Sequence, residues 1–426
     1  MRRTRLATLA TTIAVAAGVA GFLAVSTPNA QAATASRIPA HVFAPYFEAY
    51  QGDSLSGLSS QSGNKFLTLA FVQTPSPGSC TVYFNGDTSM PIATSTFGSD
   101  ITAIRAAGGD VIPSLGGYAA DNGGTEIADS CTNVDTIAAQ FEKIITTYDV
   151  TRLDLDIEDN SLTNTAGIDR RNKAIRKVED WAAANGRLVE FSYTLPTTTT
   201  GLADSGLAVL RNAVSNGARI DIVNMMTFDY YDNAAHNMAT DTQTSANGLI
   251  NQLRALYPGR TTAQLWAMVG ITEMIGVDDF GPAETLTLAN AQTVTNWAKT
   301  QGIRSLSFWA LQRDNGGCPG GAAADDCSGV AQSTWQFSRI MQSFTSGSTT
   351  TPPTTTPTSG PTTTPPTTTP TTPPTTAPGT TTWAPNTAYA VGQIVTYNGK
   401  RYQCRQAHTS IVSWEPPNVL ALWLPL

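Results

Sequence analysis

Apolar runs of strand length alternate with amphipathic stretches of helix length through most of the first 345 residues. Eight runs have the character of buried strands, near residues 41–48, 66–73, 110–116, 152–158, 189–196, 221–229, 265–273 and 305–312. Helix-like stretches lie between several of them, at residues 134–148, 169–185 and 287–301. Strands that alternate with helices form parallel sheets, because a parallel pair needs a long crossover connection. Eight such units close into a (β/α)8 barrel, whose usual length is about 250 residues.

The alternative for these elements is an open, doubly wound sheet. Such sheets bind dinucleotides through a glycine-rich turn after the first strand, and no such fingerprint follows residues 41–48. We therefore predict an α/β fold of the TIM-barrel type, a (β/α)8 barrel. The active site of that fold lies at the C-terminal ends of the strands.

Composition divides the chain into four parts. Residues 346–382 contain only Ser, Thr, Pro, Gly and Ala, which offer no large apolar side chain to bury and no charge. Such a composition predicts an extended Thr/Pro-rich tether. The tether separates a barrel domain of residues 33–345 from a segment of residues 383–426 that is rich in aromatic residues.

Residues 1–32 have the three parts of a secretory signal peptide. Arg2, Arg3 and Arg5 supply the positive end, an apolar run continues to about Val25, and Ala30-Gln31-Ala32 is a small-x-small cleavage site. The sequence after it contains no other apolar stretch long enough to span a bilayer. We therefore expect a secreted, extracellular protein without a membrane partner.

Charge and motif content exclude several function classes. Charged residues make up 13% of the chain with a formal net charge of −7, and no basic block occurs beyond the N-terminus, which argues against a nucleic-acid partner. The histidines His41, His236 and His408 are far apart and lack metal-ligand spacing. Neither a Gly-x-Ser-x-Gly elbow nor a phosphate-binding loop occurs. We expect a monomer that uses no metal and no cofactor.

The five cysteines fit an oxidising compartment. Cys318 and Cys327 bracket a short loop rich in Gly, Ala and Asp, which predicts a local disulfide. Cys80 and Cys131 would then form the second pair, although four cysteines allow three connectivities. Cys404 is left over, and as a small apolar residue it fits a buried position.

Three acidic residues alternate with aliphatic ones in the segment Leu153-Asp154-Leu155-Asp156-Ile157-Glu158. Successive side chains of a strand point to opposite faces, so the three acids share one face at spacings of about 6–7 Å. Carboxylates this close raise one another's pKa values. The pattern suits a proton donor beside charged partners. The alternative is a solvated face of an edge strand that binds a cation.

Ser114-Leu115-Gly116-Gly117 ends the third predicted strand, and Asp154-Leu155-Asp156-Ile157-Glu158 ends the fourth. These two segments resemble the pair of signatures of glycoside hydrolase family 18 chitinases, and we expect a secreted bacterial member of that family. The family's longer pattern is Asp-x-x-Asp-x-Asp-x-Glu, and Thr151 stands here in place of its first aspartate. That aspartate supports the other acids, so we expect Thr151 to alter the fine tuning of the site.

Two later segments carry the same resemblance. Met226-Thr227-Phe228-Asp229-Tyr230 is similar to the sixth-strand motif Met-x-Tyr-Asp, with Phe228 in place of the tyrosine. Residues 307–314 resemble the eighth-strand segment whose tryptophan, here Trp309, floors a sugar subsite. Tyr230 lies two residues after Phe228, on the same face of a strand, and would supply the hydroxyl that Phe228 lacks.

The resemblance implies a substrate-assisted mechanism. Glu158 would protonate the glycosidic oxygen, and the acetamido carbonyl of the bound sugar would attack the anomeric carbon. Asp156 would orient that acetamide and stabilise its developing positive charge, while Asp154 would share a proton or charge with Asp156. Glu158 would then act as base toward water, with net retention. A proton donor that works near neutral pH needs a raised pKa.

Substrate contacts are also implied for five residues near the strand ends: Asp229, Tyr230, Trp309, Gly116 and Gly117. The two glycines would let the backbone approach the sugar closely, although they could form only a tight turn. Trp309 could likewise be part of the core, and Asp229 and Tyr230 could be structural.

The C-terminal segment, residues 383–426, resembles the chitin-binding modules of carbohydrate-binding families 5 and 12. The matching residues run along the whole segment: Trp383, Thr387-Ala388-Tyr389, Gly392, residues 395–399, Tyr402, residues 408–410, Trp414-Glu415-Pro416 and residues 421–423. Alternation around Asn398-Gly399 predicts a β-hairpin and hence a small all-β module. Exposed aromatic rings grip flat polysaccharide surfaces. We predict Trp414 as the first such contact and Trp423 as the second.

Together these features predict a secreted, endo-acting chitinase with a tethered chitin-binding module. It would hydrolyse β-1,4 bonds between N-acetylglucosamine units, with chitin and N-acetylglucosamine oligomers as its partners. Two alternatives stay open: an endo-β-N-acetylglucosaminidase that acts on N-glycans, and a catalytically silent chitin-binding lectin. The chitin-binding segment argues against the first, and the intact Glu158 argues against the second.

Overall fold

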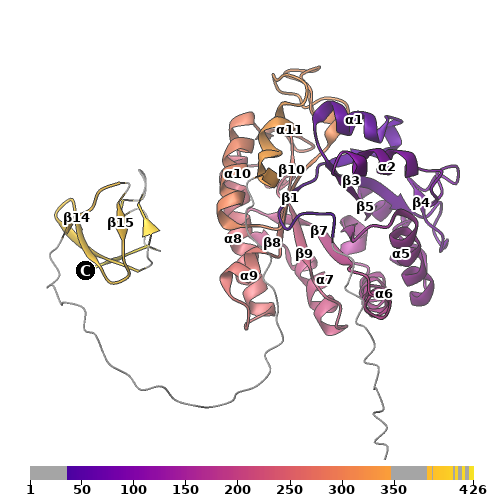
Figure 1. Cartoon of the computed structure of the whole chain (residues 1–426), viewed down its shortest axis with the longest axis horizontal. Coiled ribbons are helices and arrows are strands. Elements are labelled where there is room, and N and C mark those ends of the chain that lie inside the picture. The colour runs from indigo at the N-terminus through magenta and orange to yellow at the C-terminus, as the bar shows by residue number, and fades with distance from the viewer. Residues whose placement is uncertain (1–35, 347–380, 386, 406–407, 411–414, 418–421) are drawn as a thin grey trace, which may run out of the picture. The chain divides into compact units, whose positions relative to one another are not determined.

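The computed structural model describes residues 36–346 and 381–426, except residues 386, 406–407, 411–414 and 418–421 (Figure 1). The chain divides into two compact units, Met1–Pro353 and Thr354–Leu426. The predicted signal peptide lies outside the described residues, as do residues 347–380 of the predicted tether.

Parallel strands close into a barrel in the first unit, in the order β1-β13-β10-β9-β7-β6-β5-β3-β2. Their bounds are Val42–Phe43 (β1), Tyr46–Glu48 (β2), Phe66–Gln73 (β3), Asp110–Gly116 (β5), Arg152–Asp156 (β6), Glu190–Thr198 (β7), Ile222–Met226 (β9), Val269–Met274 (β10) and Ser305–Trp309 (β13). β1 pairs with β13 and β2 with β3, so the first predicted strand joins both ends of the sheet and closes the ring. It is split at Pro45, which has no N–H to give to a ladder. The TIM-barrel prediction is confirmed.

Helices connect the strands and cover the outside of the barrel. They are α1 (Leu55–Ser62), α2 (Gly98–Ala106), α3 (Tyr118–Gly123), α4 (Ile127–Ser130), α5 (Val134–Tyr148), α6 (Thr165–Ala184), α7 (Asp204–Ser215), α8 (Met238–Leu256), α9 (Thr262–Trp266), α10 (Leu288–Gln301), α11 (Gln336–Met341) and α12 (Ser343–Ser346). In Figure 1, α8 and α10 lie side by side on one flank of the barrel, and α5 and α6 lie together on another.

Helix α5 illustrates why these segments fold as they do. The side chain of Asn133 accepts a hydrogen bond from the N–H of Thr136 and caps the helix. Its buried residues recur every three or four positions: Ile137, Ala138, Phe141, Ile144, Ile145 and Tyr148. That spacing gives one apolar stripe, which packs against the sheet.

The first unit also contains shorter strands and 3-10 helices. They are the strands β4 (Tyr83–Phe84), β8 (Gly201–Leu202), β11 (Gly276–Asp278) and β12 (Gly281–Leu286), and the 3-10 helices η1 (Ala49–Gln51), η2 (Asp159–Leu162) and η3 (Leu311–Arg313). Both predicted disulfides are present, Cys80–Cys131 and Cys318–Cys327.

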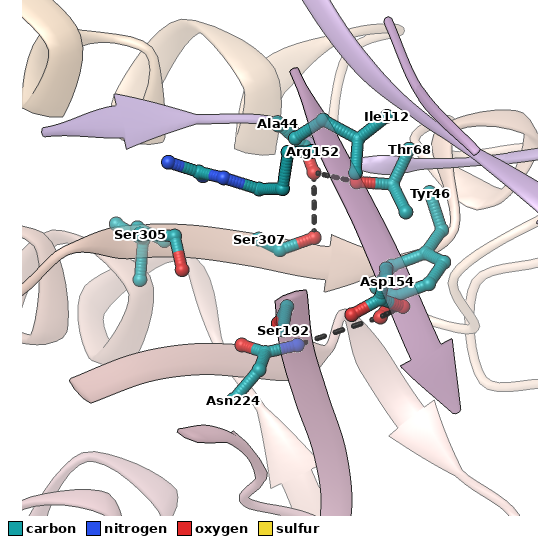
Figure 2. A pocket seen from close by; sticks show the side chains of 11 residues that line it. Ala44, Tyr46, Thr68, Ile112, Arg152, Asp154, Ser192, Asn224, Ser305 and Ser307 are labelled. Atoms are coloured by element: carbon teal, nitrogen blue, oxygen red, sulfur yellow. Dashed lines mark hydrogen bonds between the residues drawn. The ribbon is translucent and has the colours of Figure 1, made fainter. Parts of the chain in front are cut away.

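Alternation along the barrel strands separates an apolar layer from a polar one. On β6, Leu153 and Leu155 join the main hydrophobic core, together with residues of the surrounding helices. Asp154, between them, points into the barrel, where Figure 2 shows it beside Tyr46 and Asn224. The barrel interior is therefore polar, and its buried groups must find hydrogen-bond partners from other strands.

The second unit is a small all-β fold. Its larger sheet has the order β14-β16-β17-β19, from Thr381–Thr382, Ile394–Tyr397, Lys400–Cys404 and Trp423–Pro425, and β15 (Ala388–Tyr389) pairs with β18 (His408–Thr409). Asn398 and Gly399 both have positive φ, at 49° and 73°, and join β16 to β17 as the predicted hairpin turn. Cys404 is buried, as expected.

Trp423 is buried in this unit and corrects one prediction. Its side chain is 0% exposed and packs edge-to-face with Tyr389 at 5.0 Å between ring centroids. A buried ring cannot lie on a flat polysaccharide surface, so the prediction that Trp423 contacts chitin is wrong. The physical reason is size, since so short a unit has few other large side chains from which to build a core. Trp414, the first predicted contact, lies outside the described residues.

Candidate active site

The predicted acids converge at the C-terminal edge of the barrel. β6 ends at Asp156, which pairs in register with Gly116 at the end of β5. Glu158 follows two residues later, and the carboxylate of Asp229, beyond the end of β9, acts on its charge. Because all barrel strands are parallel, their C-terminal ends bring residues that are far apart in sequence to one rim.

Asp154 is the most fully bonded of the three acids. Its Oδ2 accepts hydrogen bonds from the hydroxyls of Tyr46 (2.9 Å) and Ser114 (2.7 Å), and its Oδ1 accepts one from Thr194 (2.6 Å). Burial raises the pKa of Asp154, and these hydroxyl donors lower it in part. Charge-assisted bonds of this kind favour the carboxylate form and fix its orientation.

Asn224 extends this network across the barrel. Its Nδ2 donates to Thr194 Oγ1 at 2.9 Å and to Thr272 Oγ1 at 2.7 Å. A hydroxyl has one proton to give, so the bond from Asn224 leaves the Thr194 proton for Asp154. Below Asp154 lies a cavity of about 20 Å³ lined by Arg152, Ser192, Asn224, Ser305 and other interior residues, the space of about one water molecule (Figure 2).

Asp156 lies between the other two acids and is nearly enclosed. Its Oδ1 is buried and makes no hydrogen bond within the described part of the chain. Burial raises the pKa of Asp156 well above its usual range, and negative charge on Glu158 and on Asp154 adds to the rise. Asp156 therefore tends to hold a proton, and one of its oxygens remains unused by the protein.

Glu158 is half-buried at the rim and has the pKa of a proton donor. Burial raises its pKa to about 7, and the charges of Asp229, Asp159 and Asp279 contribute, while a hydrogen bond from the backbone of Tyr118 opposes the rise. A carboxyl group that keeps its proton up to neutral pH and still reaches solvent can act as a general acid.

An aromatic platform lies beside the acids. The rings of Trp309 and Phe71 stack with centroids 5.4 Å apart and planes 12° apart, and Tyr46 tilts against Trp309 at 5.8 Å. Both stacked rings are only partly buried. Trp309 thus occupies the position that the sequence predicted for a sugar subsite.

Phe71 was missed by the sequence reasoning. It lies near the end of β3, where the pairing of β3 with β5 changes register between Leu69 and Val72. Such an irregularity changes the direction of a side chain relative to simple alternation. The available signal was a large aromatic residue close to the C-terminal end of a predicted barrel strand.

The double glycine has a structural reason of its own. Gly116 and Gly117 have φ of 101° and 85°. A Cβ on Gly116 would lie 2.0 Å from the carbonyl oxygen of Asp156, and a Cβ on Gly117 would lie 2.6 Å from the ring of Phe71. The close packing of β5 against β6 and against the aromatic platform therefore requires glycine. The predicted contact of these glycines with substrate stays a prediction.

Asp229 and Tyr230 differ in their surroundings. Burial and the charge of Asp279 raise the pKa of Asp229 to about 7, and its Oδ1 accepts the backbone N–H of Phe280 at 3.1 Å. The hydroxyl of Tyr230 is buried, and the charges that act most on it belong to Glu273 and Asp241.

A buried hydroxyl cannot contact a substrate bound at the rim of the barrel, so the prediction that Tyr230 supplies the missing hydroxyl is wrong. The reason is the backbone at Asp229, whose positive φ of 52° ends the strand alternation on which that prediction relied. The tyrosine hydroxyl that donates to one of the three acids, Asp154, is that of Tyr46.

Thr151 lies at the far end of β6 from Asp156. It precedes the strand, and its hydroxyl lies 2.8 Å from that of Ser36. The effect of threonine at this position on the fine tuning of the site stays a prediction. Support for Asp154 comes from the hydroxyls of neighbouring strands.

Two further features were sought in the described part of the chain, clusters of metal-ligating side chains and membrane-spanning helices. Within them, no group of three or more His, Cys, Asp or Glu side chains is arranged to hold a metal ion. No helix of the described part is long and apolar enough to cross a membrane.

Comparison with known proteins gives two family matches. Residues 42–401 match the family described as glycosyl hydrolases family 18, and residues 382–424 match carbohydrate-binding module family 5/12.

Two relatives and one solved structure resemble the first unit. A probable bifunctional chitinase/lysozyme of Escherichia coli (strain K12) is 34% identical over 293 residues, which are 66% of this chain and 32% of that protein. Endochitinase 11 of Metarhizium anisopliae is 33% identical over 286 residues, 65% of this chain and 53% of that protein. The chain thus spans about a third and about half of the lengths of these relatives. The catalytic domain of a hyperthermophilic chitinase from Pyrococcus furiosus superposes with a TM-score of 0.64 at 30% identity, covering 74% of this chain and 98% of that domain.

Proposed function

The chain belongs to glycosyl hydrolases family 18 and carries a carbohydrate-binding module of family 5/12, and on that premise we propose that it is a secreted chitinase. Its reaction is hydrolysis of β-1,4 bonds between N-acetylglucosamine units, with endo action preferred. The relatives described above are named as chitinases, which supports this choice of substrate.

The observation that carries the proposal is the difference between the surroundings of three acids that follow one another on β6 and just beyond its end. Asp154 is held by three hydroxyl donors, Asp156 lies between two other acids, and Glu158 has a pKa of about 7 at the half-exposed end. Titratable groups with such different environments take different roles in acid–base catalysis.

In the proposed mechanism the acids act in sequence. Glu158 donates its proton to the glycosidic oxygen, and the acetamido carbonyl oxygen of the bound sugar bonds to the anomeric carbon of that same sugar as the glycosidic C–O bond breaks. The unused Oδ1 of Asp156 accepts the acetamide N–H and stabilises its positive charge. Water then attacks the anomeric carbon and gives a proton to Glu158 as the bond to the acetamido oxygen breaks, so two inversions leave the configuration retained.

Asp154 supports Asp156 in this scheme. Because Asp154 is bonded on both oxygens by neutral hydroxyls, it can keep a negative charge that compensates the charge developing on the acetamide. The stacked rings of Trp309 and Phe71 give an apolar surface for one face of the reacting sugar.

We further propose that residues 1–32 direct secretion, that 33–345 form the catalytic domain, and that 346–382 tether the chitin-binding module of residues 383–426. The disulfides Cys80–Cys131 and Cys318–Cys327 support an oxidising compartment.

A product time course on defined N-acetylglucosamine oligomers tests the proposal. We expect cleavage within the oligomer with β-configured products at early times, as seen by NMR. Release of high-mannose glycans from a glycoprotein, without cleavage of the oligomers, would favour an N-glycan hydrolase. Binding to chitin without any soluble product would make the protein a lectin.

A further inference from the structure

Asp121 carries a buried carboxyl group beside the proposed catalytic acids. It belongs to none of the sequence motifs described above. It lies on α3, directly after the double glycine, and its backbone N–H donates to the carbonyl oxygen of Gly117 at 3.0 Å. The residue is 1% exposed. Its Oδ2 accepts the backbone N–H of Glu158 at 2.5 Å.

This bond holds the backbone of Glu158 just beyond the end of the strand. The last ladder-like bond of this segment runs from the N–H of Ile157 to the carbonyl oxygen of Thr194, at 3.0 Å. Glu158 itself has extended geometry, with φ −128° and ψ 172°, and lies outside β6. The carboxylate of Asp121 therefore accepts the backbone hydrogen bond of Glu158, as the carbonyl oxygen of a neighbouring strand would inside the sheet. A misplacement of about 1 Å in a catalytic group can cost about 10²-fold in rate.

The second oxygen of Asp121 is in an unusual environment. Oδ1 is buried and accepts no hydrogen bond within the described residues, and a Cβ on Gly116 would lie 3.5 Å from it. The charged groups that act on Asp121 are Glu126, Glu158 and Arg171, and Arg171 is already bonded to Glu126 at 2.7 Å. Asp121 in turn acts on Asp156.

Negative charge thus predominates around Asp121. Burial, with the charge of Glu126 next, raises the pKa of Asp121 to about 9. A neutral carboxyl group can still accept the N–H of Glu158 at one oxygen while it carries a proton on the other.

We propose that Asp121 is a positioning residue of the catalytic centre: one oxygen anchors the backbone of Glu158, and the proton on the other keeps an additional negative charge away from Asp156 and Glu158. If Asp121 were ionised, its charge would raise the pKa of both acids. Asp156 would then hold its proton still more strongly and stabilise a positive acetamide less well. The kinetic consequences rest on the proposed function, whereas the state of the carboxyl group does not.

Two substitutions separate the two parts of the proposal. Asp121→Asn keeps an oxygen that accepts the Glu158 N–H and is always neutral, so we expect kcat within about threefold of the native value and an unchanged alkaline limb of kcat/KM. Asp121→Ala removes the anchor, so we expect kcat to fall by about tenfold or more with KM changed by less than about threefold. Rescue by Asn relative to Ala distinguishes anchoring from a general loss of fold.

Asp159→Asn is the matched control, because it removes an exposed carboxylate that raises the pKa of Glu158. We expect its alkaline limb to move to lower pH. A comparable shift in Asp121→Asn would show that native Asp121 is ionised and would overturn the second part of the proposal. Native kcat in Asp121→Ala would overturn the first part.

Infrared difference spectroscopy of the native protein and Asp121→Asn at pH 7 gives a readout without substrate. We expect a protonated-carboxyl band in the native protein that the variant lacks. Its absence would contradict the neutral state even if Asp121→Ala failed to fold. If the native protein cleaved no oligomer, the proposed function would fail while this band still decided the state of Asp121.

Discussion

Tyr46 donates its hydroxyl proton to Oδ2 of Asp154 at 2.9 Å, across the barrel interior from β2 to β6. The same ring tilts against Trp309 at a centroid distance of 5.8 Å. One side chain therefore connects the innermost acid to the aromatic platform. The orientation of Tyr46 is thus fixed at its hydroxyl by Asp154 and along its ring by Trp309.

Tyr46→Phe should reduce kcat while leaving the aromatic packing in place. The substitution removes a hydrogen bond to a charged group, an interaction of about 1.5–3 kcal/mol, so we expect a reduction of about 10- to 100-fold on soluble oligomers. Tyr148→Phe is a suitable control, since that hydroxyl bonds to the carbonyl oxygen of Ala93, remote from the acids. Equal effects of the two substitutions on kcat would argue against a role for Tyr46.

Glu158→Gln should abolish turnover and retain binding. Loss of a general acid lowers rates by about 10²–10⁴-fold, whereas the amide keeps the shape of the side chain. Hydrolysis of oligomers and sedimentation with insoluble chitin measure the two properties separately. Normal turnover in this variant would refute the assigned role.

The activity should fall as pH rises through about 7. Glu158 must be protonated to act as acid, and its pKa is raised to about 7, so the active form is present below that pH and is lost above it. Asp229→Asn removes the charge that raises this pKa most, so the alkaline limb of kcat/KM should move to lower pH. A shift to higher pH would contradict this electrostatic coupling.

Phe71→Ala should weaken substrate binding although Phe71 belongs to no recognised motif. Loss of the ring removes the stacking partner of Trp309, and aromatic pairs contribute about 0.5–1.5 kcal/mol beyond their burial. We expect KM for soluble oligomers to rise by about 3- to 10-fold. Phe71→Tyr keeps the ring and should retain most of the affinity. An unchanged KM in the alanine variant would exclude Phe71 from the platform.

Gly116→Ala should destabilise the barrel more than Gly52→Ala. Both glycines have positive φ, at 101° and 81°, so both variants bear backbone strain of about 1–3 kcal/mol. Only at Gly116 would the new methyl group collide with backbone, 2.0 Å from the carbonyl oxygen of Asp156, whereas nothing lies within 4 Å at Gly52. Urea unfolding measures the difference, and similar midpoints would contradict the packing argument.

The local sequence pattern was sufficient to predict the barrel and to place the three acids on one of its strands. Strand-length apolar runs, amphipathic helices and the alternation through Leu153–Glu158 depend on neighbours in sequence, so they could be predicted without tertiary contacts. The two disulfides followed from spacing and exclusion. The sequence could not reveal Asp121, because its contact with Glu158 depends on the turn that α3 makes after β5.

The wrong predictions share one cause. Tyr230 and Trp423 were assigned from alternation and residue type, and both side chains are directed inward by packing that the chain reaches only when folded. Phe71 was missed because an irregular register in β3 redirects it.

The sequence by itself determined the fold class, the order of its elements and the strand that bears the proposed catalytic acids, because periodicity and motif spacing are properties of adjacent residues. Only the tertiary structure decided which hydroxyls hold Asp154, which rings form the platform and which carboxyl anchors Glu158. Those contacts join strands and loops that are tens to hundreds of residues apart, and closure of the barrel selects them.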